Sequence, residues 1–216
     1  MPGDSLAAPE GLTVEPMSSA QASALAIEHH YLHRRPPISF AFGLYRHGLP
    51  VGVVTFGTPP SRHLQMGACP SDPSLVIELN RLWVSDSEGT NTESWFVSRA
   101  LRQLPPRIVV SYADTREGHY GYIYRALNFR YAGWTDMDRK TPRYDYIPID
   151  PTRHTRESSR SGVAKKVRRL PKVKYWLVTG NRRERRDLER LCGWPSLDWR
   201  ELPPPVLESQ AVESVA

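Results

Sequence analysis

Cysteine and long apolar runs are scarce in this sequence. Only Cys69 and Cys192 occur in 216 residues, too few and too widely separated for a disulfide framework or a cysteine-based zinc site. We therefore expect two reduced thiols. No apolar run approaches the roughly 20 residues that a membrane-spanning helix needs, and the amino terminus lacks the basic and then apolar pattern of a signal peptide. A soluble, cytoplasmic protein without membrane contact is expected.

The length of the chain suits one substantial core and is short for two enzyme domains. Internal repeats are absent. Residues 1–12 are small and polar, and together with residues 201–216 they are expected to be disordered tails. We expect one catalytic domain over residues 13–200, which includes a basic extension over residues 151–200.

Acidic residues are few between residues 153 and 200, where the runs KKVRR, KVK and NRRERR occur. Such a stretch is typical of a surface that binds a polyanion, with a solvated face as the alternative. Cations in the first turn of a helix expected over residues 181–194 are unfavourable, so an anionic partner is expected. The predicted nucleic-acid contacts are Lys165, Lys166, Arg168, Arg169, Arg182, Arg183, Arg185 and Arg186.

The most informative stretch covers residues 107–133, RIVVSYADTREGHYGYIYRALNFRYAG. Its β-branched beginning predicts a buried strand that ends at Asp114, and a polar turn with His119 follows. The next residues predict a helix. Its apolar positions at helical spacing are Tyr120, Ile123, Tyr124 and Leu127. Strand, turn and helix in this order place Asp114 and His119 at the carboxyl end of a strand, where open α/β sheets usually carry their site.

Two resemblances rest on this stretch. IYRALNF resembles the LYxxxGF helix end of GNAT acyltransferases, and it puts Tyr124 where that superfamily often has a catalytic tyrosine. Together with HYLHR, ELNRLWVSD and NTESWFVSRAL, the stretch resembles the Mom family of bacteriophage DNA adenine-modification proteins over roughly residues 25–150. The resemblance implies a GNAT-like α/β fold, with a mixed central β-sheet flanked by helices. It also implies conversion of adenine N6 in DNA to N6-(carbamoylmethyl)adenine, which protects phage DNA from restriction.

Hydrophobic periodicity predicts the remaining elements. Helices are expected over residues 20–35 and 92–104, and strands over 38–46, 50–58, 75–86, 131–140, 142–149 and 172–180. The strands over 131–140 and 142–149 are expected to complete an edge of the sheet. Residues 61–74 contain too much proline and glycine for core, and residues 154–167 are typical of a linker.

A glycine-rich phosphate loop is also missing. Acyl-CoA-binding GNAT proteins have a Q/RxxGxG/A loop whose N–H groups hold the pyrophosphate, whereas residues 86–94 are DSEGTNTES. Glu88 and Glu93 would repel a diphosphate there, so ordinary coenzyme A binding is not expected. Thr90 or Thr92 is expected to cap the helix. The candidates for hydrogen-bonding a different donor or the product are Asn91, Ser94 and Ser98, the last counted among the catalytic residues.

Modification of adenine requires a proton acceptor, because the N6 lone pair is delocalised into the ring. Asp114 is the predicted acceptor, and capping of the following turn is its alternative role. Tyr124 either donates a proton to the leaving group or oxyanion, or stacks on the base. His119 either orients Asp114 or contacts the DNA backbone.

An adenine flipped out of duplex DNA must be stacked and held. The GNAT resemblance makes the end of the first helix a wall of this site, with surface histidines as the alternative. Polar residues in the strand over 75–86, Glu78, Asn80 and Arg81, either pair with one another or are functional, because an unpaired buried charge is costly. Expected substrate contacts are His30, Tyr31, Arg34, Arg81, Ser111 and Tyr112. No metal is expected, since adjacent histidines face different ways and no carboxylate stands beside them at ligand spacing.

The donor follows from an isomer relation. A carbamoylmethyl group on N6 is an isomer of a glycyl group on N6, and the GNAT resemblance implies acyl transfer. Activated glycine on tRNA is therefore the expected donor, with acyl-CoA as the alternative, and double-stranded DNA with a flipped-out adenine is the expected partner. The alternative function is that of a nucleic-acid-binding or small-molecule-acetylating relative.

Overall fold

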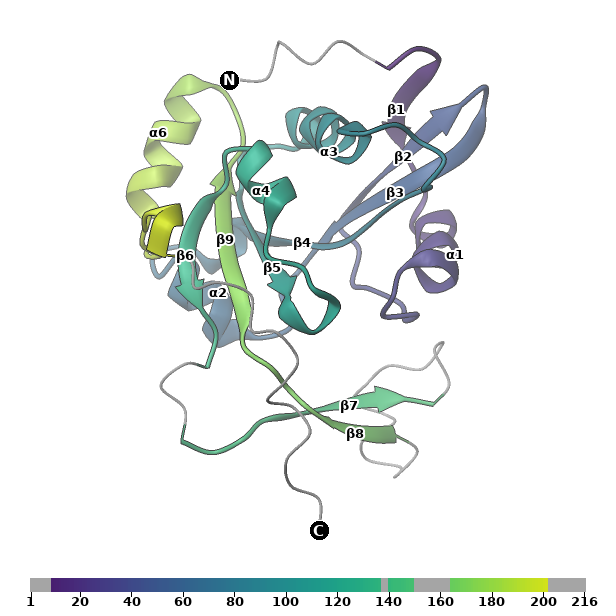
Figure 1. Cartoon of the computed structure of the whole chain (residues 1–216). Coiled ribbons are helices and arrows are strands. Elements are labelled where there is room, and N and C mark those ends of the chain that lie inside the picture. Colours follow the sequence, from purple (N-terminus) through teal and green to yellow (C-terminus); the bar gives the residue numbers. More distant parts are fainter. Residues whose placement is uncertain (1–8, 137–139, 150–163, 202–216) are drawn as a thin grey trace.

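The computed structural model of the chain describes residues 9–136, 140–149 and 164–201 (Figure 1). Most of the two predicted tails lies outside these ranges. The strands are β1 (Leu12–Pro16), β2 (Phe40–Arg46), β3 (Leu49–Gly57), β4 (Val76–Val84), β5 (Ile108–Asp114), β6 (Arg130–Trp134), β7 (Tyr144–Pro148), β8 (Ala164–Arg168) and β9 (Lys172–Val178). The helices are α1 (Ser19–His29), α2 (Arg62–Ala68), α3 (Thr92–Gln103), α4 (Tyr122–Ala126) and α6 (Arg182–Leu191). No helix in the described ranges is long and apolar enough to span a membrane.

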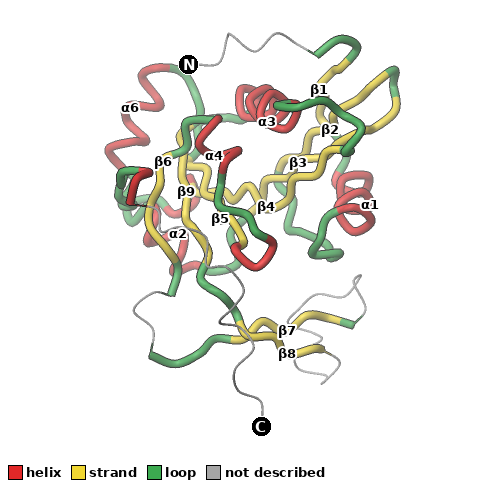
Figure 2. The backbone as a smooth tube through the Cα atoms, in the orientation of Figure 1, coloured by secondary structure: helices red, strands yellow, loops and turns green. Residues whose placement is uncertain are grey.

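Seven strands form one mixed sheet in the order β1-β2-β3-β4-β5-β9-β6 (Figure 2). Only β4 and β5 pair in parallel, and every other neighbouring pair is antiparallel. Because a parallel pair needs a crossover, α3 connects β4 to β5. The arrangement confirms the predicted α/β class, a mixed central sheet flanked by helices.

Helices cover both faces of this sheet. One face, here called the α3 face, packs under α3 and α4, where Val109 and Ala113 of β5 meet Phe96 in the largest apolar cluster (Figure 1). On the opposite face, here called the α1 face, Val110 packs in a cluster with Leu188 of α6. A separate cluster on the α1 face contains Ala22 of α1. The α6 cluster thus covers the first residues of β4 and β5 on the α1 face, and the α1 cluster covers β2 and β3.

One predicted strand was misplaced. Residues 142–149 do not complete the sheet edge, because β7 pairs with β8 in a separate two-stranded antiparallel sheet. Only β6 joins the edge, beside β9. The reason is chemical: β8 carries Lys165, Lys166 and Arg168, and a helix-covered sheet would bury these cations without partners. The end of the predicted linker is therefore strand, and residues 150–163 lie outside the described residues.

Three further predictions need correction. Residues 61–74 contain helix α2, and Ala68 and Cys69 are fully buried, so this segment contributes to the core. Helix α1 ends at His29, well before residue 35. Helix α4 begins only at Tyr122, because Gly121 has φ 86° and leaves no room for a β-carbon beside Tyr175.

Candidate active site

The parallel strands β4 and β5 separate along their length. Their pairing covers three positions, from Val76 opposite Ile108 to Glu78 opposite Val110. Beyond these positions β4 stays paired with β3 as far as Val84, and β5 pairs only with β9. The two strands therefore form a fork that opens toward their carboxyl ends, and Glu78 is the last residue of β4 that pairs with β5.

A β-bulge aligns the polar residues of β4. Thr55 of β3 lies opposite Arg81 and Phe56 opposite Leu79, so Asn80 is an extra residue. Without it, Glu78 and Arg81 would face opposite sides of the sheet, because strand side chains alternate. Asn80 is held in place by two hydrogen bonds: it accepts from the Thr55 hydroxyl (2.6 Å) and donates to the Pro37 carbonyl (2.8 Å). Asn80 is thus structural, and it brings Glu78 and Arg81 to the α1 face.

Glu78 has a perturbed carboxyl group. Burial raises its pKa to about 7, although the positive charges of Arg81 and Lys172 oppose this shift. Burial disfavours the ionised form, and the two cations do not fully restore it. Glu78 is therefore a carboxyl group that changes charge near neutral pH, and it lies at the point where β4 and β5 begin to separate.

Arg81 and His30 are buried beside one another. Both are less than 9% exposed, and burial lowers the pKa of Arg81 to about 10, with Arg34 adding to the shift. Burial and then the Arg81 charge lower the pKa of His30 to about 3, so this imidazole is neutral at pH 7. The Arg81 guanidinium donates to the Asn80 carbonyl (2.5 Å), but its Nε has no hydrogen-bond partner among the described residues. Such a buried donor suits an acceptor atom of a substrate.

Aromatic rings line the side of the fork next to α1. Tyr31 stacks on His30 with 4.2 Å between ring centroids, and it meets His119 edge to face at 5.7 Å. Burial and then the charge of Asp114 raise the pKa of Tyr31, so its phenol is neutral. The fold thus brings Arg81 and His119, from two distant segments, together with the predicted neighbours His30 and Tyr31.

Asp114 lies at the end of β5, as predicted, but both its oxygens are occupied. One accepts from the backbone N–H of Arg116 (3.2 Å) and caps a short 3-10 turn, and the other pairs with the Lys172 ammonium (2.6 Å). The alternative capping role is therefore realised. A small cavity of about 130 Å³ borders this pair. Its lining residues are Tyr31, Leu32, Arg34, Asp114, Arg116, Glu117, Arg169, Leu170 and Lys172.

Ser111 and Tyr124 occupy the other side of the fork. Ser111 Oγ lies 2.9 Å from the Leu79 carbonyl oxygen of β4 and 2.7 Å from the Tyr124 hydroxyl. Because a serine has one O–H, its donation to Leu79 leaves Tyr124 as the donor to Ser111. Burial raises the pKa of Tyr124 to about 12, so the phenol keeps its proton. Its ring stacks on Tyr175 at 4.8 Å, and Tyr175 stacks on Trp199.

The start of α3 also lies on this side of the sheet. Asn91, not Thr90 or Thr92, is the N-cap residue, and its side chain makes no capping bond. The Ser94 hydroxyl donates to the Asn91 carbonyl (2.9 Å), and Ser98 follows one turn later. Glu88 forms an ion pair with Arg46 of β2 (2.6 Å). Repulsion of a diphosphate by Glu88 is therefore weaker than the sequence indicated. Among the described residues, no hydrogen bond or ion pair joins Asn91, Ser94 or Ser98 to the fork.

Tyr112 completes the α1 face of the site. Its ring meets Trp194 edge to face at 6.2 Å, and burial and then the charge of Glu78 raise its pKa. Lys174 lies over the same Trp194 ring at 5.4 Å. Lys172, Lys174 and Trp194 were not predicted as site residues. The β5–β9 pairing brings the two lysines here from a distant segment, and Trp194, which follows α6, packs against Tyr112 and Lys174.

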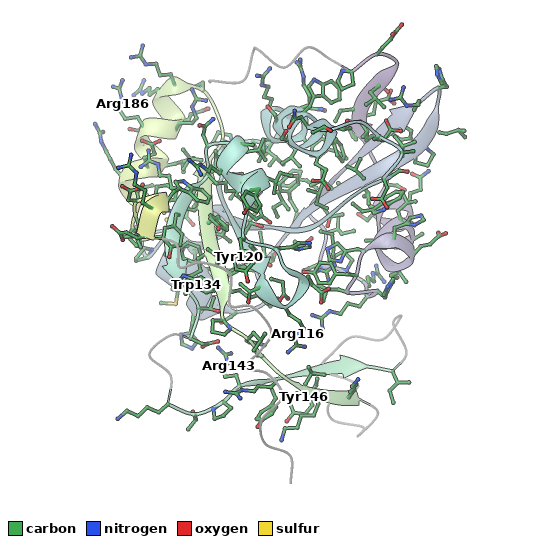
Figure 3. All side chains as sticks on the ribbon, in the orientation of Figure 1. Arg116, Tyr120, Trp134, Arg143, Tyr146 and Arg186 are labelled. Carbon is green, nitrogen blue, oxygen red and sulfur yellow. The ribbon has the colours of Figure 1, made fainter. Side chains whose placement is uncertain are left out.

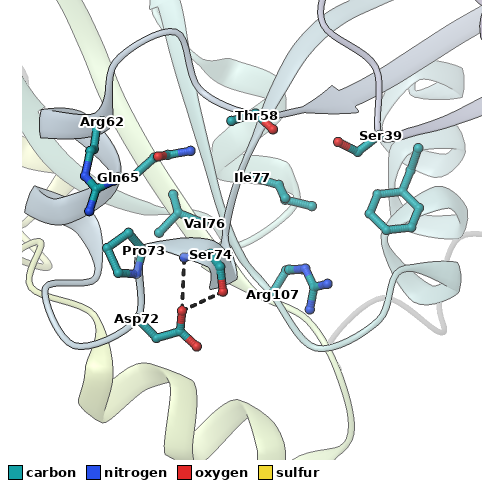
Figure 4. A pocket seen from close by; sticks show the side chains of 11 residues that line it. Ser39, Thr58, Arg62, Gln65, Asp72, Pro73, Ser74, Val76, Ile77 and Arg107 are labelled. Carbon is teal, nitrogen blue, oxygen red and sulfur yellow. Dashed lines mark hydrogen bonds between the residues drawn. The ribbon is translucent and has the colours of Figure 1, made fainter.

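A larger cavity of about 590 Å³ lies at the opposite, closed end of the β4–β5 pair (Figure 4). Arg62 and Arg107 point into it from its two sides. Its acid, Asp72, accepts from the backbone N–H and the hydroxyl of Ser74 (3.1 and 2.5 Å). Arg107 donates to the Pro106 carbonyl (2.7 Å). None of the predicted catalytic residues lines this cavity.

The predicted nucleic-acid contacts divide into two surfaces. Arg186 of α6 and Tyr146 of β7 lie at opposite ends of the molecule (Figure 3). The negative charge expected at the start of α6 comes from the helix itself. Glu184 accepts from the Asn181 N–H (2.7 Å), and the Asn181 side chain accepts from the Glu184 N–H, which forms a capping box. The basic runs therefore do not form one continuous surface, and α6 needs no external anion for its cap.

His29 and His33 are held by neighbours outside the fork. His29 stacks on Trp83 at 3.9 Å, and the His33 ring bonds the Ile27 carbonyl (2.9 Å). Within residues 9–136, 140–149 and 164–201, no three His, Cys, Asp or Glu side chains gather as metal ligands.

A family model described as the Mom protein family matches residues 11–182. The methylcarbamoylase Mom of Escherichia phage Mu is 34% identical over 131 residues, which are 56% of this chain and 54% of that protein. The match therefore spans about half the length of this relative.

Solved structures of acetyltransferases are similar to this chain at low sequence identity. A putative acetyltransferase from Salmonella typhimurium, solved with acetyl-CoA, has a TM-score of 0.47 and 12% identity over 80% of this chain and 96% of its own. An N-acetyltransferase from Staphylococcus aureus has a TM-score of 0.45 and 14% identity, with 78% and 99% covered.

Proposed function

Because the chain belongs to the Mom protein family, we propose that it is a transferase that modifies the exocyclic N6 of adenine in double-stranded DNA. The phage Mu relative is named a methylcarbamoylase. The proposed product is N6-(carbamoylmethyl)adenine, a modification that hides phage DNA from restriction enzymes. The open end of the β4–β5 fork is the proposed site.

The observation that carries this proposal is the polar cluster at the fork, where the half-buried Glu78, with its pKa of about 7, lies beside the buried Arg81. A weak nucleophile such as adenine N6 needs a base whose pKa lies near the working pH. Buried titratable groups with strongly shifted pKa values gather at functional sites more often than elsewhere. Glu78 is therefore proposed as the proton acceptor, and Asp114, whose oxygens are occupied, as the residue that holds Lys172 and the 3-10 turn.

The two faces of the fork suit two substrates. A flipped-out adenine would enter from the α1 face and stack against Tyr31, with N6 directed at Glu78. The acyl donor would approach from the α3 face, where Ser111 and Tyr124 lie. As N6 attacks the acyl carbonyl, the unpartnered Nε of Arg81 is placed to stabilise the negative oxygen, and the Tyr124 hydroxyl to protonate the leaving group.

The proposed donor is glycine esterified to tRNA, with acyl-CoA as the alternative. Attack of N6 forms an N6-glycyl amide and releases the tRNA hydroxyl, and the N6 proton passes to Glu78. The free glycyl amine then attacks C6 through a five-membered ring, and the C6–N6 bond breaks. The original N6 becomes the terminal carboxamide nitrogen, and the glycine nitrogen becomes the nitrogen attached to the ring. This sequence needs no oxidant and no second enzyme.

Plasmid DNA from cells that produce the protein tests the activity itself. Mass analysis of its deoxynucleosides should reveal deoxyadenosine heavier by one carbamoylmethyl group in place of a hydrogen. Plasmid from cells that carry the empty vector is the control. Unmodified deoxyadenosine in both samples, with soluble protein present in the first, would contradict the proposal.

The donor is tested separately with glycine labelled at nitrogen and preloaded on tRNA. Purified protein and duplex DNA should yield product with the label on the ring-attached nitrogen. Label in the terminal carboxamide would exclude the rearrangement, and product formed only with an acyl-CoA would replace the tRNA donor.

A further inference from the structure

The β7–β8 hairpin carries a cationic and aromatic face. Tyr144 lies opposite Arg168, and Tyr146 lies opposite Lys166, so these four side chains share one side of the ribbon. Tyr144 and Tyr146 are 42% and 41% exposed, although large apolar surfaces are usually covered. The Lys166 ammonium lies 4.2 Å from the Tyr144 ring centroid. The four residues Tyr144, Tyr146, Lys166 and Arg168 are called the ribbon face below.

This hairpin stands apart from the seven-stranded sheet, on the side of the molecule where the labelled side chain of Arg116 points (Figures 1 and 3). Its base is nevertheless anchored to the candidate site. The Arg116 guanidinium donates to the Arg168 carbonyl, and the Thr115 hydroxyl donates to the Pro171 carbonyl (2.9 Å). Lys172, which begins β9, pairs with Asp114. The ribbon is thus connected to the turn that follows β5 at three successive points.

The dimensions of the ribbon suit a groove of duplex DNA. Strands of five residues extend over roughly 17 Å. The major groove of B-form DNA, about 12 Å wide, admits a two-stranded β-ribbon without deformation of the duplex, whereas the minor groove is only about 6 Å wide. Lys166 and Arg168 supply the positive charge, and Lys165 adds to it from the adjacent position.

We infer that the β7–β8 hairpin enters the major groove of duplex DNA with its ribbon face and thereby presents a flipped-out adenine to the fork. The inference deepens the proposed function and rests on it for the choice of DNA as the partner. In this arrangement Lys166 and Arg168 contact phosphates or base edges, and the two tyrosines contact the sugar and base surface without adding charge. The anchored base of the hairpin fixes the distance between the groove and the cavity beside Asp114.

The test measures binding and needs no donor, so it stands even if no modification is ever found. Lys166→Ala with Arg168→Ala should lower the log–log salt slope of duplex binding by roughly two, about 0.9 for each lost contact. Tyr144→Ser with Tyr146→Ser should weaken binding by roughly tenfold and leave the salt slope unchanged. The charge-conserving pair Lys166→Arg with Arg168→Lys should keep the slope.

The matched control removes two positive charges elsewhere, by Arg62→Ala with Arg99→Ala, and should change the slope little. Dimethyl sulfate footprinting then identifies the groove: wild-type protein should protect guanine N7, which faces the major groove, and the alanine pair should lose this protection. Unchanged slope and protection in the alanine pair would overturn the inference. So would protection of adenine N3 alone, or loss of tRNA binding with intact duplex binding.

Discussion

The open and the closed ends of the β4–β5 pair differ in what they bury. At the closed end a cavity of about 590 Å³ is lined by groups that neighbours already satisfy, such as Asp72 with Ser74. At the open end the cavity is only about 130 Å³, but the buried Arg81 and His30 and the half-buried Glu78 have strongly shifted pKa values there. We therefore base the proposed site on the shifted titratable groups and not on cavity volume.

The difference has a structural cause. At the closed end, pairing of β4 with β5 provides hydrogen-bond partners for the backbone groups. Beyond Glu78 the strands separate, and side chains supply the contacts between them. Ser111 bridges the gap on one face, and the bulge at Asn80 places Arg81 on the other. Burying these charges costs stability, which a protein accepts where function requires it. Four predictions separate the two ends, beginning with the largest expected effect.

Glu78→Gln should reduce the rate of adenine modification by about 100-fold or more, because the amide keeps the shape of the side chain but accepts no proton. The rate is measured on duplex DNA with purified protein, and the unfolding temperature of the variant serves as the control. A folded variant that retains at least half of the wild-type rate would remove Glu78 from the role of base.

Asp114→Asn and Lys172→Met should each slow modification by roughly tenfold, and the double substitution should cost no more than the worse single one, because both break the same pair. A double-mutant cycle on the rate constants measures this coupling. If Asp114 is instead the proton acceptor, as the sequence alone predicts, Asp114→Asn should cost as much as Glu78→Gln, and Lys172→Met far less.

The rate should also depend on pH through Glu78. Its pKa is raised to about 7, so the proton-accepting form predominates above pH 7, and kcat/KM should rise with an inflection near that value. Stability should change with pH in the opposite direction from the rate. A raised carboxyl pKa stabilises the fold at low pH, and this contribution is lost as the pH rises through about 7. Glu78→Gln should abolish both dependences, measured by rate profiles and by thermal unfolding at several pH values. If kcat/KM of Glu78→Gln still rose with an inflection near pH 7, the titration would belong to another group.

Arg62→Ala with Arg107→Ala should change the rate by no more than about twofold, because substitutions away from a site usually have small effects. These two arginines line the large cavity of the closed end. A loss comparable to that of Glu78→Gln would move the functional site to this cavity.

The sequence predicted best those residues of the candidate site that lie close together along the chain. The β-branched run before Asp114 predicted β5, and the same stretch contained Ser111, Tyr112, His119 and Tyr124, all of which the fold places at the fork or beside it. Tyr31 and Arg81 also lie there. Their proximity follows from the sheet order, which periodicity alone does not determine.

Long-range pairing explains what the sequence could not indicate. Lys172 reaches Asp114 only because β9 inserts between β5 and β6. The proposed role of Glu78 depends on the point where β4 and β5 separate, and on the one-residue bulge that brings Arg81 to the same face. The basic runs looked continuous, yet the antiparallel pairing of β7 with β8 separates Lys165 and Lys166 from α6.

The most direct test of the account compares three proteins in cells: the wild type, Glu78→Gln, and Arg62→Ala with Arg107→Ala. Modified deoxyadenosine in plasmid DNA is measured by mass analysis, and soluble protein is quantified in each culture. We expect the wild type and the closed-end variant to modify DNA equally, and Glu78→Gln to leave it unmodified. Wild-type levels of modification with Glu78→Gln, or their loss only in the closed-end variant, would contradict the assignment of the active site to the open end of the fork.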